Sequence, residues 1–146
     1  MPTRTMLAIA LVLLVSLAGC SKRFVKLSEN EVNQADKAQA TEVGNTLLHK
    51  LQASQFYPLG EEVSPKMRQT FTPGEQAAAW AAIVQRYGEF QHMVYAQTWG
   101  SRDGRDTRIY RFRGTFGKGQ PEVRVVINAQ GQLDGLWIKD WKEGVE

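Results

Sequence analysis

The sequence predicts an α+β domain in which N-terminal helices pack on one face of a curved, four-stranded antiparallel sheet. Apolar residues recur every three or four positions as far as Tyr87, and every second position after Gly88. Short connections rich in glycine, asparagine and aspartate separate the later segments, so neighbouring strands are expected to pair antiparallel. The chain is 42% hydrophobic and 23% charged, which is typical of a globular protein. We therefore expect a single folded domain over residues 31–146.

Residues 1–19 have the features of a cleaved export signal. Arg4 supplies a positive charge, and the apolar run Met6–Ala18 that follows is shorter than the about 20 residues needed to span a bilayer. The sequence Leu17-Ala18-Gly19-Cys20 resembles the bacterial lipobox. This resemblance implies cleavage before Cys20, a diacylglycerol on the cysteine sulfur and acyl chains such as palmitate. The alternative is an ordinary signal peptide that ends at a free cysteine.

The residue after the cysteine bears on localisation. Ser21 follows Cys20, which resembles the outer-membrane sorting address of lipoproteins in bacteria with two membranes. The resemblance implies a protein of the cell envelope that is anchored in the outer membrane and faces the periplasm, with the lipid bilayer as its first partner. Residues 20–30 are expected to form the lipidated cysteine and a short tether.

Charge and cysteine content exclude several functions. Cleavage after residue 19 of 146 leaves 127 residues, and the loss of Arg4 lowers the formal net charge from +3 to +2. This charge is too small to steer a nucleic acid, so no nucleic-acid partner is expected. Cys20 is the only cysteine, so a lipidated chain has no disulfide and no thiol chemistry.

Two helices are expected before the sheet. The first covers Glu31–Ser54, where apolar residues follow a helical period. The second covers Pro73–Tyr87, with Thr72 as its N-terminal cap and Gly88 in the left-handed position that ends it. Residues 55–70 are expected to form a loop with one or two turns of helix.

Four strands are expected after the second helix, and their alternation predicts two different faces. The strands are Glu89–Trp99, Thr107–Phe116, Pro121–Asn128 and Gln132–Trp141. The face toward the helices is expected to carry Tyr110, Phe112, Phe116, Val123, Val125 and Ile127. The opposite face, expected to meet water, carries Arg111, Arg113, Glu122 and Arg124.

Two runs carry a family resemblance. Trp80-Ala-Ala-Ile-Val-Gln-Arg-Tyr-Gly-Glu-Phe90 and Val125-Val-Ile-Asn-Ala-Gln-Gly-Gln-Leu-Asp-Gly-Leu136 are similar to small uncharacterised bacterial domains related to the nuclear transport factor two and SnoaL-like cone fold. The resemblance covers about Glu31 to Trp141. It implies a cone-like arrangement in which a helix closes one side of a bent sheet around a pocket. Some members of that superfamily use the pocket for catalysis, and many only bind a ligand there.

The sequence contains no recognisable catalytic motif. There is no phosphate-binding loop, no Gly-x-Ser-x-Gly and no His-Glu-x-x-His. Two isolated histidines, His49 and His92, and one lipidated cysteine do not form a metal-ligand pattern. We therefore predict no catalytic residue, no cofactor and no metal. The alternative is a SnoaL-like isomerase or hydrolase in which one of these histidines is the base and Asp134 or Asp140 is its partner.

Aromatic residues and arginines are the remaining candidates for a site. Trp99, Tyr110 and Trp141 are candidate pocket residues, because aromatic side chains commonly line ligand sites. The alternative is that they fill the core of a small domain. The three arginines expected on the outer sheet face either dock an acidic partner or lipid headgroups, or form a solvated face that balances Glu122 and Asp134.

These observations leave two classes of function. The first is a non-catalytic domain, held at the membrane, that binds a small ligand or an envelope protein. The second is the small-molecule enzyme described above. Anchoring, a fold that can form a pocket and the missing catalytic motifs favour the first.

Overall fold

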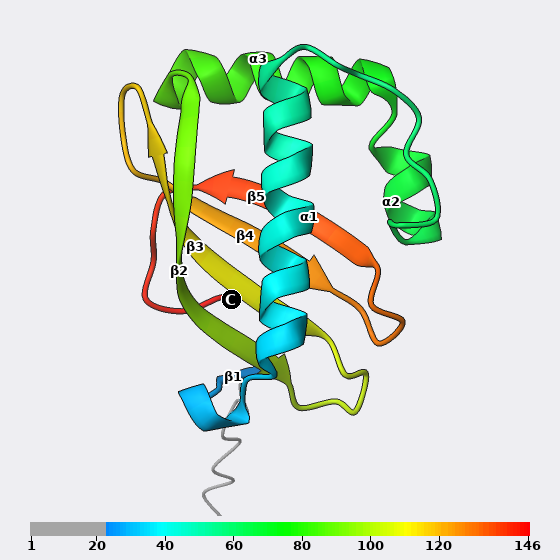
Figure 1. The fold of residues 1–146 in the computed structure, drawn as a ribbon, viewed down its shortest axis with the longest axis vertical. Helices are drawn as coiled ribbons and strands as arrows, with labels where there is room; N and C mark the ends of the chain where they lie inside the picture. Colours follow the sequence, from blue (N-terminus) through cyan, green and yellow to red (C-terminus); the bar gives the residue numbers. More distant parts are fainter. Residues whose placement is uncertain (1–22) are drawn as a thin grey trace, which may run out of the picture.

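The computed structural model describes residues 23–146 and has an α+β fold. Five antiparallel strands form one open sheet in the order β1-β2-β3-β4-β5. Figure 1 shows the long helix α1 lying across one face of this sheet, with α3 at one end and α2 beside β5. The predicted fold class is therefore confirmed at the level of helices on an antiparallel sheet. The predicted lipidation site, Cys20, lies outside the described residues.

Local capping signals fix the helix boundaries. α1 covers Gln34–Gln52 and starts at the Asn33 cap, whose side chain accepts hydrogen bonds from two backbone amides of the first turn. This start is later than predicted because Glu29–Glu31 form a separate 3₁₀ turn. The short helix α2 (Pro65–Thr70) lies in the predicted loop. α3 covers Pro73–Tyr87, as predicted, with Thr72 and Gly88 at its ends.

Residues 23–146 contain five strands where four were expected. β2 (Phe90–Ser101), β3 (Arg108–Phe116), β4 (Glu122–Ile127) and β5 (Leu133–Lys139) correspond to the four predicted strands. The additional strand, β1 (Phe24–Lys26), pairs with the end of β2. It lies in the segment for which the sequence predicted a tether. Three residues are too few to show an alternating pattern, so pairing with β2 determines this strand rather than its own sequence.

The main core lies between the helices and the sheet. Leu48 and Ala40 of α1, Trp80 of α3 and Phe112 of β3 are all buried in it. The predicted inner face is confirmed: Tyr110, Phe112, Phe116, Val123 and Val125 belong to this core, and Ile127 packs against it. Gly44 permits the close approach of α1 to the sheet, since a Cβ atom there would lie 3.0 Å from Val125 Cγ2.

The opposite face of the sheet, called the outer face below, is covered in part by the end of the chain. After β5 the chain turns back across this face, as the red segment of Figure 1 shows. Ile109, Val126 and Val145 form a small second cluster there, with Phe24 and Trp99 packed against it. Among residues 23–146, no helix has the length and apolar character needed to cross a membrane.

Candidate functional site

A small cavity opens between the sheet and the start of α1. Its volume is about 190 Å³, which corresponds to about six water molecules at about 30 Å³ each. The wall comes from the 3₁₀ turn, the first turns of α1 and strands β2 to β4, and the residues that matter chemically are Glu31, Asp36, Thr98, Asp106, Arg108 and Tyr110. The cavity therefore lies between the start of the long helix and the inner face of the sheet.

Tyr110 places an unpartnered hydroxyl in this cavity. Its side chain is only 2% exposed, yet its hydroxyl forms no hydrogen bond with residues 23–146. Within that part of the chain, every side-chain polar atom that is fully shielded from solvent has a hydrogen-bond partner. The Tyr110 hydroxyl has none, so it must be open to solvent, and the open space beside it is the cavity. Burial, with a smaller contribution from the Asp36 charge, raises the pKa of Tyr110 to about 12. The hydroxyl is therefore neutral and able to donate a hydrogen bond to a ligand.

The cavity wall carries more negative than positive charge. Arg108 is paired with Asp106 at 2.9 Å. Glu31 accepts hydrogen bonds from the hydroxyl and the backbone amide of Ser28, and these bonds lower the pKa of its carboxyl. Asp36, in the first turn of α1, forms no salt bridge with any residue that the structure describes. A ligand that is cationic or rich in hydroxyl groups would complement this wall.

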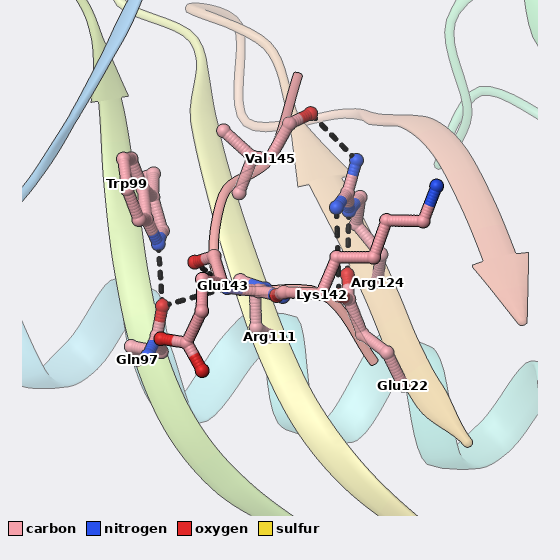
Figure 2. A network of polar contacts seen from close by, with 8 residues as sticks. All are labelled: Gln97, Trp99, Arg111, Glu122, Arg124, Lys142, Glu143 and Val145. Carbon is pink, nitrogen blue, oxygen red and sulfur yellow. Dashed lines mark hydrogen bonds and ion pairs between the residues drawn. The ribbon is translucent and has the colours of Figure 1, made fainter. Parts of the chain in front are cut away.

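The outer face holds a buried ionic cluster of Arg111, Glu122 and Arg124, called the triad below. The side chains of Arg111 and Glu122 are 0% exposed and that of Arg124 is 9% exposed. The prediction that Arg111, Glu122 and Arg124 face water is therefore wrong, and it is met only by Arg113, which is exposed. The reason is the C-terminal segment, residues 142–146, which covers them (Figure 2).

Strand register brings the triad together. Arg111 of β3 lies directly opposite Arg124 of β4, an arrangement of like charges that would be destabilising without an anion between them. Glu122 supplies this anion: Oε1 accepts from Arg111 at 2.5 and 3.0 Å, and Oε2 accepts from Arg124 at 2.6 Å. Burial alone would raise the pKa of the Glu122 carboxyl, but the hydrogen bonds and charges of the two arginines outweigh it and hold the pKa below its usual value.

The triad also holds the C-terminal segment in place. Arg111 donates to the backbone carbonyls of Lys142 and Glu143, and Arg124 donates to the carbonyl of Val145 at 2.9 Å. Figure 2 shows these bonds on the side of the sheet away from α1. The guanidinium groups satisfy backbone carbonyls of a segment that crosses the face of the sheet and pairs with none of the strands β1 to β5. The triad is thus a structural device that fixes the chain end on the sheet.

Comparison with known families identifies the domain. Residues 44–136 match the model of a family described as a protein of unknown function (DUF3887). The chain belongs to this family. No curated protein and no solved structure matches the chain. The matched region of this DUF3887 chain contains Tyr110 and the whole triad, and it ends before the C-terminal segment.

The three aromatic residues predicted to share a pocket do not meet in this DUF3887 domain. Tyr110 lines the cavity, whereas Trp99 and Trp141 lie on the outer face. Trp99 donates to Gln97 at 2.6 Å, and the ring of Trp141 stacks on the guanidinium groups of Arg111 and Arg113 at 3.9 and 3.8 Å. Alternation along β2 places Trp99 on the outer face, where it lines a small hollow with Phe24 and Val145. Trp141 follows the end of β5 at Lys139, and the turn of the chain brings it to the same face.

The residues considered for acid-base catalysis are scattered. His49 is exposed, with its ring against Phe90 at 5.3 Å, and His92 is exposed on β2. Asp140 accepts from the Tyr87 hydroxyl at 2.7 Å and pairs with Arg86, and Asp134 lies on the outer face. None of these four residues lines the Tyr110 cavity. No group of three or more His, Cys, Asp or Glu side chains suited to a metal occurs within residues 23–146.

Sequence reasoning missed the C-terminal segment as a structural element. Two features of the sequence could have indicated that the chain end packs on the sheet. Opposite charges recur on one face of β3 and β4, and the chain end contains two apolar residues, Trp141 and Val145, that a solvated tail would not need.

Proposed function

We propose that this chain is a lipid-anchored envelope protein whose folded domain binds a small ligand without transforming it. The anchor rests on the lipobox resemblance of residues 17–20, and an outer-membrane location rests on Ser21. Lipoprotein acylation supplies more than one chain, which is what stable membrane anchoring requires. The architecture, with one helix laid across a sheet and a cavity between them, supports the resemblance to the cone fold.

The single observation that carries ligand binding is the Tyr110 hydroxyl in its cavity. The hydroxyl is open to the cavity and is not used by residues 23–146, so a ligand with a hydrogen-bond acceptor can bind there without breaking a hydrogen bond within this part of the chain. The size and charge of the cavity favour a small amine or polyol. The carboxylates of the wall either pair within the protein or sit at the mouth, and neither histidine is near, so binding is the role that this arrangement serves best.

Amide chemical-shift titration tests this proposal. Ethanolamine, glycerol and acetate serve as probes of a cation, a polyol and an anion. We expect the first or second to shift the amides of Asp36, Thr98 and Tyr110, and acetate to leave them unchanged. Tyr110→Phe should weaken binding about fivefold, the effect of one hydrogen bond, whereas Tyr57→Phe, outside the cavity, should not.

The enzyme alternative is separated from binding by the histidines. A combined His49→Asn and His92→Asn variant should preserve the cellular role of the protein, while a Tyr110 variant that remains folded should impair it. The reverse pattern, a folded but inactive double-histidine variant, would contradict the binding proposal and favour the isomerase or hydrolase.

A further inference from the structure

A second and larger hollow lies on the outer face of the sheet, next to the triad. This groove has a volume of about 700 Å³, within the range of about 300–1,000 Å³ of ligand sites. Ile109, Val126 and Val145 lie along it, and each is less than a tenth exposed. The same C-terminal segment that the triad holds in place therefore forms one wall of the groove. The groove lies on the opposite face of the sheet from the Tyr110 cavity, and the two linings share Asn128 and Ala129 at the turn after β4.

Basic side chains dominate the lining of the groove. Arg23, Lys66, Arg105, Arg124 and Lys139 contribute five positive charges, against the single carboxylate of Asp134.

Three of these cations are already engaged. Arg23 and Arg105 share Asp103, and Arg124 is bound to Glu122. Within residues 23–146, Lys66 and Lys139 form no salt bridge. They come from α2 and β5, and both line the groove, Lys66 from the side where β5 begins and Lys139 from the end of β5.

The positive charge in the groove is incompletely compensated. Burial lowers the pKa of the Lys139 ammonium, and the nearby Arg124 charge adds to this effect more than Glu122 opposes it. An anion that enters the groove would therefore gain favourable interactions with Lys139 or Lys66 without first breaking a salt bridge of that lysine.

Trp137 gives the groove an amphipathic rim. Its side chain is 50% exposed, which is unusual for so large an apolar group. It lies on the same face as Arg124, its partner in register. Half-exposed tryptophan beside basic side chains is the combination found where a protein surface meets lipid headgroups.

The proposed anchor would hold this groove close to a membrane. Arg23, which lines the groove, is three residues after Cys20. Three extended residues span at most about 11 Å, which is close to the distance over which charges interact at physiological salt, about 8 Å. The surface of the bilayer is therefore the nearest source of anions to this groove.

We propose that the outer-face groove binds the phosphate-bearing headgroup of an anionic phospholipid, with the ammonium groups of Lys66 and Lys139 supplying the attraction and Trp137 at the level of the interface. The membrane source of the headgroup rests on the proposed lipidation of Cys20. Headgroup binding would orient the domain, so that the sheet faces the bilayer and the Tyr110 cavity faces the periplasm.

An amide chemical-shift titration of the purified chain tests this inference. The probe is glycerophosphoglycerol, the water-soluble headgroup of phosphatidylglycerol, compared with glycerophosphocholine and inorganic phosphate. We expect glycerophosphoglycerol to shift the amides of Val126, Trp137 and Lys139, and to bind at least about tenfold more tightly than the choline compound, whose own cation opposes the lysines.

Paired variants provide the control. Lys66→Gln combined with Lys139→Gln should weaken binding at least about tenfold, since each lysine near an anionic headgroup contributes about fivefold. Lys26→Gln combined with Lys118→Gln removes the same charge outside the groove and should leave binding unchanged. If the first pair does not fold, Lys66→Gln alone, on the surface of α2, should weaken binding about fivefold.

Three outcomes would overturn the inference. Equal loss in both pairs would show non-specific attraction, equal binding of inorganic phosphate would assign the groove to free phosphate, and absence of binding would exclude an anion site. Because the probes are soluble, the result does not depend on whether Cys20 carries lipid. Failure of headgroup binding in the groove can thus be distinguished from absence of lipid on Cys20.

Discussion

Replacing Glu122 by glutamine should destabilise the domain strongly. The substitution preserves volume but removes the only anion between two buried guanidinium groups, whose side chains are 0% and 9% exposed. It also weakens the charge-assisted bonds from Arg111 and Arg124 to the two carboxylate oxygens. Breaking one partner out of a buried ion pair costs about 3–5 kcal/mol, against a total stability of about 5–15 kcal/mol for a domain of this size.

Urea titration at pH 7, followed by tryptophan fluorescence, measures this loss. The control is Glu42→Gln on the exposed side of α1, which should change the free energy of unfolding by no more than about 0.5 kcal/mol. A loss below about 1 kcal/mol for Glu122→Gln would refute the reasoning, because it would mean that the triad is hydrated. Replacing all three residues by apolar ones of similar size should cost less than Glu122→Gln, while releasing the C-terminal segment to added protease.

Three further predictions follow from burial and pKa. Trp80 is 5% exposed in the core, so Trp80→Ala should lower the free energy of unfolding by about 3–5 kcal/mol. A loss under about 1 kcal/mol on urea titration would show that the ring does not belong to the core. Because the folded pKa of Glu122 is lowered, its contribution is complete above the unfolded pKa of about 4.3 and is lost as the pH falls through the folded value. The stability difference between the natural chain and Glu122→Gln should therefore shrink at low pH, and a constant difference would contradict this. Burial raises the pKa of Tyr110 to about 12, so the part of the ultraviolet titration curve near that pH should be smaller in Tyr110→Phe than in the natural chain. This variant should remain stable because no hydrogen bond within residues 23–146 is lost.

The regular elements of the fold could be predicted from the sequence because each carries a local signal. The proline and threonine at the start of α3, the glycine at its end and the alternation along β3 and β4 are read from neighbouring residues alone. The strand β1 could not be predicted in this way, because it depends on pairing with β2. The 3₁₀ turn before α1 does carry a local signal, the capping box of Ser28 and Glu31, which the sequence reasoning missed.

For the candidate site, prediction from the sequence is limited by what covers each face of the sheet. Alternation correctly separates Tyr110 from Arg111, but it does not say what covers the outer face. That face was expected to be exposed to solvent because it carries charged residues, yet the C-terminal segment buries Arg111, Glu122 and Arg124. Only the path of the chain after Lys139 decides between a solvated and a buried face, and this path is a long-range property. The position of Trp141 depends on the same path, because this residue follows the last strand.

Mass spectrometry of the mature N-terminal peptide tests the central claim, that the domain is held at a membrane by lipid. The account predicts a peptide that begins at Cys20, with a diacylglycerol on its sulfur and an acyl chain on its amine. Cys20→Ser should abolish both the modification and the cleavage before that position. An unmodified Cys20, or cleavage at another bond, would contradict the claim.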